Sequence, residues 1–248
     1  MKKILLAIFF LALSLTANSI NIAVAANVSY AIKDLIKEFN KQNPNIKVQV
    51  TLGSSGKLTA QIKNGAPYDL FMSANMKYPN NLYENGLSLT KPLVYAKGSL
   101  AILSTKKQDF STGISVVNNK SIEKIAIANP KTAPYGIATV EALKNAKLFE
   151  SIQKKFIYGE SISQTVSYTV IATQLGFIAK SSLFSPKMKK YKKDINWIDV
   201  NPELYTAINQ GIIILKSTKK QKEVRAFYDF IFTQKAKKVF EDFGYLVK

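Results

Sequence analysis

The chain of 248 residues carries 35 Lys and Arg residues against 16 Asp and Glu residues, which gives a formal net charge of +19. It contains no Cys and no His, which excludes thiol and imidazole catalysis, disulfides and the usual zinc and haem ligands. Its hydrophobic content of 47% is sufficient for a sizeable core in one domain or two lobes.

The N-terminus predicts a secretory signal peptide over residues 1–19. Lys2 and Lys3 precede an apolar run of about 12 residues, and small residues follow it. The run is shorter than the roughly 20 residues that span a bilayer. We expect cleavage after Ser19, with Ala17 as the near alternative, and no lipid anchor because the chain has no Cys. The sequence therefore predicts a soluble, exported protein.

Removing Lys2 and Lys3 with the leader lowers the net charge from +19 to +17. Such a balance is compatible with nucleic acid or an anionic membrane surface as partner. Export argues against nucleic acid, and the lysines are spread over polar turns and helix faces. We interpret them as a solvated basic surface that attracts anions weakly.

The first strand–helix unit spans residues 20–43. An apolar run at 20–27 is followed by a helical pattern with an apolar face at i, i+3, i+4 and i+7, formed by Ile32, Leu35, Ile36 and Phe39. Asn27 or Ser29 can cap this helix, and Asn43-Pro44 ends it.

The second unit joins a half-buried strand at 47–52 to a short helix that ends near Gly65. Two further units follow at 124–150 and 156–174. Additional strands are expected at 68–75, 93–105, 175–184 and 211–218, and the C-terminal segment has a helical pattern ended by Gly244. Strands that alternate with helices predict an α/β class with parallel sheets.

Each of the four strand–helix junctions carries small or hydroxyl-bearing residues: Asn27 and Ser29; Ser54 and Ser55; Pro134, Tyr135 and Gly136; Ser161 and Ser163. Any one of them is explained by plain helix capping. Helix N-termini also attract anions, and ligands of open α/β sheets bind at the carboxyl ends of strands. If the four junctions converge, they form a cage of neutral donors for a small oxyanion.

Enzymatic alternatives are poorly supported. The segment GSSGKL lacks the spacing of a phosphate-binding P-loop, and G-x-S-x-G is absent. A Ser–Lys hydrolase would pair Ser54 or Ser55 with Lys57, but no further acid or base is evident. The carboxylates Asp34, Asp69 and Glu141 show no paired spacing for acid–base work, and we expect Asp69 to order a strand start or a turn. The sequence predicts that the protein is not an enzyme.

Residues 53–75, GSSGKLTAQIKNGAPYDLFMSAN, resemble the segment GSSG-x-L-x-x-QI-x-x-GAP-x-D-[LV]-F-x-SA of the ModA family, the periplasmic molybdate-binding proteins of ABC transporters. Residues 25–39, 128–143, 175–183 and 227–248 also resemble segments of that family in the same order. The resemblance covers nearly all of the chain after the leader.

This resemblance implies a type II periplasmic-binding-protein fold, in which two α/β lobes are joined by two crossing strands with a ligand cleft between them. The first lobe is expected at residues 20–98 plus 203–248, and the second at 99–202. The implied ligand is molybdate or tungstate, the implied partner is a membrane ABC permease, and no cofactor or metal other than the oxyanion is expected. A periplasmic monomer that does not bind nucleic acid is implied.

The resemblance also implies five positions around the oxyanion. Asn27 stands where the family has a serine, and its amide and backbone N–H remain donors. Ser55 is expected to donate from its hydroxyl and its N–H, and Tyr135 and Ile162 from their backbone N–H. Ala179 stands where many relatives have a tyrosine hydroxyl, so that donor is lost unless another side chain replaces it; the candidates are Lys180, Tyr135 and Tyr168.

Two alternatives remain open besides a purely structural, adhesive protein with a basic face, which would bind no ligand. One is a receptor of the same fold for another ligand, such as sulfate, phosphate or a ferric complex, although the absence of His argues against ferric iron. The other is a secreted Ser-dependent hydrolase.

Overall fold

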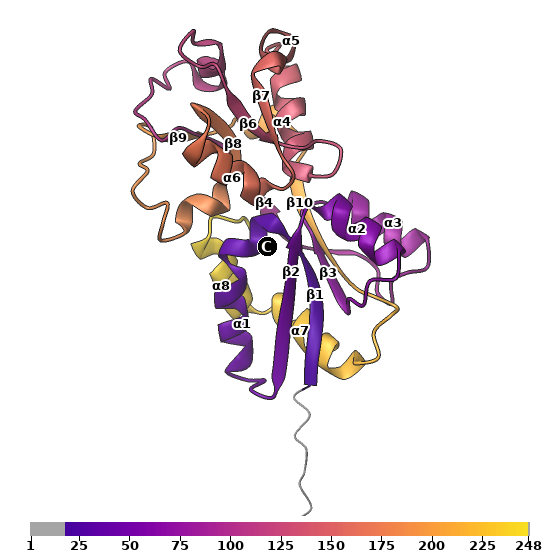
Figure 1. Cartoon of the computed structure of the whole chain (residues 1–248). Helices are drawn as coiled ribbons and strands as arrows, with labels where there is room; N and C mark the ends of the chain where they lie inside the picture. Colours follow the sequence, from indigo (N-terminus) through magenta and orange to yellow (C-terminus); the bar gives the residue numbers. More distant parts are fainter. Residues whose placement is uncertain (1–17, 248) are drawn as a thin grey trace, which may run out of the picture.

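The computed structural model describes residues 18–247, which form two five-stranded sheets flanked by helices (Figure 1). We call the part built on the sheet β2-β1-β3-β10-β4 the first lobe and the part built on β7-β6-β8-β5-β9 the second lobe. The α/β class predicted from the sequence is confirmed.

The first sheet comprises β1 (Asn18–Ala25), β2 (Ile46–Gly53), β3 (Leu70–Ser73), β4 (Leu93–Gly98) and β10 (Ile208–Ile214). Its apolar side chains divide between two faces. One face packs under α1 (Ile32–Asn40), α7 (Gln221–Ile231) and α8 (Gln234–Asp242), and the other packs under α2 (Ser55–Lys63) and α3 (Lys77–Glu84). The predicted apolar face of the first helix is confirmed: Leu35 and Phe39 are fully buried in this core.

The second sheet comprises β5 (Leu100–Leu103), β6 (Ile125–Ala128), β7 (Phe156–Gly159), β8 (Leu175–Ala179) and β9 (Trp197–Asp199). Its larger core packs against α4 (Pro134–Asn145) and α5 (Phe149–Ile152), and α6 (Ile162–Ile171) covers part of the sheet on the side of the first lobe (Figure 1). Short 3₁₀ helices complete the fold: η1 (Ala26–Tyr30), η2 (Gly113–Asn118), η3 (Gln153–Lys155), η4 (Lys180–Phe184) and η5 (Pro202–Leu204).

The chain passes between the two sheets twice. The first passage is at Ser99, between β4 and β5, and the second is between β9 and β10, where η5 packs against α4 of the second lobe. The lobe boundaries predicted at 98/99 and 202/203 fall in these two passages and stay predictions.

Three local predictions differ from the structure. The sheets are mixed rather than parallel, because β10 runs antiparallel to β3 and β4, and β5 runs antiparallel to β8 and β9. The C-terminal pattern is divided into α7 and α8, since Thr233 interrupts it and accepts a capping hydrogen bond from the Ala236 N–H. Neither Asn27 nor Ser29 caps α1, because η1 lies between β1 and that helix.

The predicted leader lies outside the described residues except for Asn18 and Ser19. These two residues form the start of β1 and pair with Ile46 and Lys47 of β2. Between residues 18 and 247, none of the helices combines the length and apolar character that a membrane span requires.

Candidate functional site

The two lobes meet around a small pocket where four helices begin, which we call the cavity. Its walls come from the starts of η1 and α2 in the first lobe and of α4 and α6 in the second, from the ends of β1 and β2, and from the loop after β3. The lining residues are Ala25, Ala26, Asn27, Gly53, Ser54, Ser55, Ala74, Ala133, Pro134, Tyr135 and Ile162. Four of the five residues expected from the sequence, Asn27, Ser55, Tyr135 and Ile162, therefore meet at one place.

Strand order explains this convergence. Strands β1 and β2 are parallel neighbours, as are β6 and β7, so their carboxyl ends lie together at one edge of each sheet. Each of these four strands leads into one of the four helices that line the cavity. The two edges face each other across the cleft, which is the usual ligand position in open α/β sheets.

The first turn of each helix leaves backbone N–H groups without intrahelical acceptors. Within residues 18–247, no hydrogen bond is found from the backbone N–H of Asn27, Ser55, Tyr135 or Ile162 to another protein group. Helices α2, α4 and α6 also direct the positive ends of their dipoles toward the cavity. The arrangement is suited to holding an anion.

A hydrogen bond from Ala74 orients the Ser55 side chain. Its side chain is fully buried, and its Oγ accepts a hydrogen bond of 3.0 Å from the backbone N–H of Ala74. The hydroxyl proton has no acceptor among the described residues, so it is available to donate to a ligand. The adjacent Ser54 Oγ is also buried without a hydrogen-bond partner.

Asn27 differs from the expectation drawn from the sequence. Its Nδ2 donates to Gln210 Oε1 at 2.8 Å and to the Tyr245 hydroxyl at 2.9 Å, which occupies both amide protons. Its Oδ1 is buried without a partner. In this structure Asn27 therefore offers a ligand its backbone N–H and an amide oxygen, not the amide donor that we expected.

Ala179 is not among the cavity-lining residues. Its side chain is fully buried in the apolar core of the second lobe. Of the three side chains considered as replacement donors, Lys180 forms an ion pair of 2.8 Å with Asp199, and Tyr135 is the one that lines the cavity.

Buried tyrosines surround the Asn27 amide. Burial raises the pKa of Tyr95, Tyr135 and Tyr245 well above the usual value of a phenol. All three hydroxyls consequently stay neutral at physiological pH, and no phenolate charge opposes an anion in the cavity.

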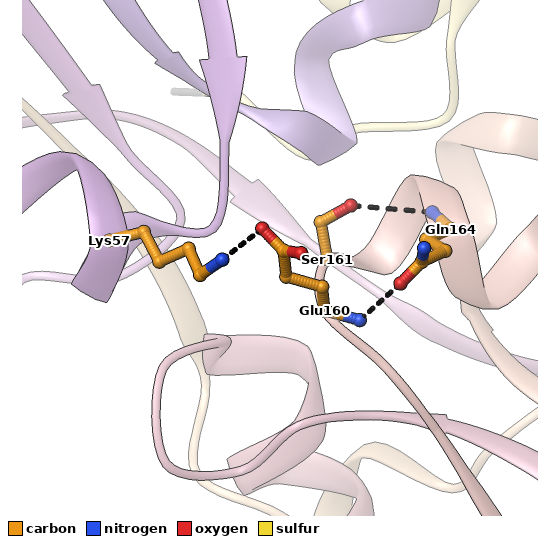
Figure 2. Close-up of polar contacts among 4 residues, drawn as sticks. All are labelled: Lys57, Glu160, Ser161 and Gln164. Carbon is orange, nitrogen blue, oxygen red and sulfur yellow. Dashed lines mark hydrogen bonds and ion pairs between the residues drawn. The ribbon is translucent and has the colours of Figure 1, made fainter.

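Contacts between the lobes close the cavity on several sides. The Gly56 N–H donates to Thr132 O at 2.9 Å, and Ser163 Oγ donates to Ala26 O at 2.8 Å. Lys57 and Glu160 form an ion pair across the cleft mouth (Figure 2). The helix dipole disfavours a cation in the first turn of α2, and this pairing compensates for that cost.

The Glu160 end of this pair is held by the start of α6. The Glu160 N–H donates to Gln164 Oε1 at 2.6 Å, and Ser161 Oγ accepts from the Gln164 N–H at 3.3 Å, a reciprocal capping arrangement (Figure 2). The strand–helix junction at Ser161, which the sequence predicts to attract an anion, thus also positions a contact between the lobes.

We expect Lys57→Met to weaken ligand binding no more than about fivefold, because half-exposed ion pairs contribute at most about 1 kcal/mol. Titration calorimetry at low and high salt measures the effect, which screening should remove at high salt. Lys63→Met is the control, since Lys63 is exposed at the end of the same helix and has no ion pair within residues 18–247. Equal losses in both variants, or a loss that persists at high salt, would contradict this role.

Sequence reasoning missed Gln210, Tyr245 and Ser181, which bond to Asn27. Ser181 Oγ donates to Asn27 O at 3.0 Å, and the Tyr245 hydroxyl donates to the same oxygen at 2.9 Å. The one available indication was a Gln within the otherwise apolar segment QGIIIL, where a buried polar side chain needs a partner.

The donor set does not indicate a metal centre. Between residues 18 and 247, no group of three His, Cys, Asp or Glu side chains is placed to bind a metal ion.

Asp69 has the structural role that the sequence suggested, since its Oδ2 accepts a 2.7 Å hydrogen bond from the Asn21 N–H in β1.

Comparison with known proteins agrees with this architecture. Residues 20–246 match the family described as bacterial extracellular solute-binding protein. The molybdate-binding protein ModA of Azotobacter vinelandii is 32% identical over 95% of this chain and 92% of its own length. The solved structure of the periplasmic molybdate-binding protein of A. vinelandii gives a TM-score of 0.85 at 30% identity, covering 92% of this chain and 99% of that one.

A more distant structure shares the fold alone. The sulfate-binding protein SubI of Mycobacterium tuberculosis gives a TM-score of 0.73 at 13% identity, covering 92% of this chain and 86% of that one. The predicted type II periplasmic-binding-protein fold is confirmed by these likenesses. The chain belongs to the bacterial extracellular solute-binding proteins and, within them, to the ModA family.

Proposed function

We propose that this protein captures molybdate, and also tungstate, and delivers it to a membrane ABC permease. The observation that carries the proposal is the cavity between the lobes, where four helix N-termini direct N–H groups inward. Among residues 18–247, these groups have no partner in the protein and no charged side chain lines the wall. Similarity to proteins named for molybdate binding supports the choice of ligand.

The wall chemistry favours a fully deprotonated oxyanion. Backbone N–H groups and the Ser55 hydroxyl are donors, and no carboxylate lines the cavity to accept a proton from the ligand. A protonated phosphate would leave its own donor without a strong acceptor. Cavity size is then expected to separate molybdate and tungstate from sulfate, because a smaller ion cannot reach all donors at once.

Hydrogen bonds from neutral donors supply enough free energy to bind a dianion with micromolar affinity. A hydrogen bond to a charged group contributes about 1.5–3 kcal/mol. Five of them sum to roughly 7.5–15 kcal/mol before ordering and desolvation costs, whereas micromolar affinity needs about 8 kcal/mol. A dianion can therefore be held without a salt bridge.

We assign the binding roles to the backbone N–H groups of Asn27, Ser55, Tyr135 and Ile162 and to the Ser55 hydroxyl. Because these residues come from both lobes, the anion makes its full set of contacts only when the lobes are closed, so binding stabilises closure. The permease would then recognise the closed shape. Under this proposal the protein is an exported, periplasmic monomer whose leader is removed.

The second candidate is a receptor for another tetrahedral oxyanion such as sulfate. It is favoured by the neutrality of the wall, since the same donors suit any tetrahedral dianion, and by the fold shared with a sulfate-binding protein.

Thermal unfolding of the leaderless protein with molybdate, tungstate, sulfate and phosphate tests both candidates. Ligand at 100 times its dissociation constant stabilises a receptor by about 2.7 kcal/mol, which appears as a higher Tm. We expect this rise with molybdate and tungstate. A rise with sulfate alone supports the second candidate, and no rise with any oxyanion contradicts both.

We expect Ser55→Ala to weaken molybdate binding by about 1–3 kcal/mol, because one charged hydrogen bond is lost. The substitution also leaves the Ala74 N–H without its acceptor, so the Tm of the ligand-free variant must be measured alongside calorimetry. Thr59→Ala is the control, since Thr59 is buried on the same helix and its hydroxyl bonds to Ser55 O rather than lining the cavity. An unchanged affinity in Ser55→Ala would remove this hydroxyl from the site.

A further inference from the structure

Three buried polar atoms without hydrogen-bond partners belong to side chains that lie next to one another beside the cavity. They are Asn27 Oδ1, Gln210 Nε2 and the Tyr135 hydroxyl. Asn27 and Gln210 belong to the first lobe, in η1 and β10, and Tyr135 belongs to the second, in α4. A buried polar group that lacks a partner is costly, so three of them linked together require an explanation.

Gly98 brings two of these atoms to the same place. A Cβ atom at Gly98 would lie 2.2 Å from the Tyr135 hydroxyl oxygen and 2.7 Å from Gln210 Nε2. The hydroxyl and the amide nitrogen therefore both border the position that a side chain at residue 98 would occupy. The Gln210 amide thus bridges Asn27 on one side and Tyr135 on the other.

The present orientation of the Gln210 amide produces the mismatch. Its Oε1 accepts from Asn27 Nδ2 at 2.8 Å and from the Tyr95 hydroxyl at 2.8 Å, while its Nε2 points to the side of Tyr135. Since Asn27 Nδ2 is used here, the only side-chain atom that Asn27 has left for a ligand is an oxygen. An anion is repelled by such an acceptor.

We propose that Gln210 is a positioning residue for the anion site, and that the Asn27 and Gln210 amides both turn over when the anion binds. This inference rests on the proposed function. Gln210 Nε2 then donates to Asn27 Oδ1 and to the Tyr95 hydroxyl, and Gln210 Oε1 accepts from the Tyr135 hydroxyl. Asn27 Nδ2 is released from Gln210 and from the Tyr245 hydroxyl and donates to the anion in the adjoining cavity.

The reversed arrangement gives a partner to each of the three atoms. Tyr245 keeps its hydrogen bond to the Asn27 carbonyl oxygen, because the backbone does not move. Tyr135 is able to donate, since burial keeps its hydroxyl protonated. Two donors are left over: the Tyr95 hydroxyl, which no longer has Gln210 Oε1 as acceptor, and Asn27 Nδ2, which is paired only when the cavity holds an acceptor. The ligand therefore selects the orientation of both amides.

The turning of the two amides also connects anion binding to closure of the lobes. A hydrogen bond in which Tyr135 donates to Gln210 Oε1 crosses between the lobes and requires the reversed arrangement, because only then does the amide oxygen face the hydroxyl. Because Gln210 lies on β10, next to the passage between the sheets, the anion stabilises a contact at the hinge without touching it.

The first test is calorimetry with molybdate on Gln210→Met, in which an unbranched side chain of similar length replaces the amide. We expect at least tenfold weaker binding, because Asn27 loses the partner that orients it, together with a lower Tm of the ligand-free protein, because Asn27 Nδ2 and the Tyr95 hydroxyl lose their acceptor. Asn209→Met is the matched control, since Asn209 is the neighbouring, exposed amide on β10, and its affinity should equal that of the wild type. Wild-type affinity in Gln210→Met would overturn the proposal.

The second test does not depend on a variant that folds. In the ¹⁵N-labelled wild-type protein, the Gln210 amide protons should show nuclear Overhauser contacts to the Tyr135 ring without ligand and to the Tyr95 ring with molybdate. Contacts that stay on Tyr135 in the saturated protein would overturn the proposal. If the wild-type protein does not bind molybdate at all, the proposed function fails instead, and the two failures are thus distinguished.

Discussion

Replacing Asn27 with Asp is expected to abolish measurable molybdate binding. Residue 27 is fully buried at the cavity wall, and no cationic side chain lines that wall. Two unit charges about 4 Å apart interact by about 4 kcal/mol at an effective dielectric constant of 20, and a dianion interacts more strongly. Since each 1.4 kcal/mol is a factor of ten, we expect calorimetry to show affinity reduced by more than about 100-fold.

The matched control for this variant is Asn27→Ser. It keeps the site neutral, retains the backbone N–H and restores the residue type that the ModA family resemblance implies at this position. We expect it to bind more weakly than the wild type but much more tightly than Asn27→Asp, since the amide hydrogen bonds to Gln210 and Tyr245 are lost but no charge is added. If Asn27→Asp also bound molybdate within tenfold of the wild type, the anion would not lie beside residue 27.

The second large effect is expected for Gly136→Ala, at the start of α4. A Cβ atom there would lie 2.1 Å from Ala128 O and 2.9 Å from Pro130 N, both of which are backbone atoms. Neither can move without displacing β6 or the turn that carries Tyr135. Overpacking typically costs about 1–3 kcal/mol, and we expect a destabilisation at or above the upper end, with loss of anion binding. Urea unfolding and calorimetry measure the two effects.

Gly65→Ala separates this clash from the general cost of losing a glycine. Gly65 ends α2 with φ +82°, and a Cβ atom there would meet nothing within 4 Å. The left-handed conformation costs an alanine roughly 1–2 kcal/mol, so the variant should be moderately destabilised but still bind molybdate. A Gly136→Ala protein with the urea midpoint of the wild type would contradict the close approach of α4 to β6.

The parts of the site that the sequence predicts are those set by local patterns. Strand and helix periodicities place Asn27, Ser55 and Tyr135 at strand–helix junctions, the family resemblance adds Ile162, and parallel neighbouring strands bring such positions together. The backbone N–H donors of those residues follow directly, because the first turn of any helix leaves them free.

The parts that the sequence does not predict depend on distant contacts. The orientation of the Asn27 amide is set by Gln210 and Tyr245, which lie 183 and 218 residues away along the chain. Similarly, the antiparallel placement of β10 follows from the return of the chain to the first lobe, which no local pattern encodes.

Ala179 illustrates the limit of transferring a position from a family. Alignment of motifs assigns it to the site, but residue 179 ends β8 with its side chain in the core of the second lobe. Tyr135 instead brings a tyrosine side chain to the cavity wall from a different element.

The central claim is that neutral donors from both lobes bind a large tetrahedral dianion. Titration calorimetry of the leaderless protein with molybdate, tungstate, sulfate and phosphate tests it most directly. We expect one site per chain, micromolar or tighter binding of molybdate and tungstate, and at least tenfold weaker binding of sulfate and phosphate. No heat with molybdate, or equal affinity for all four anions, would contradict it.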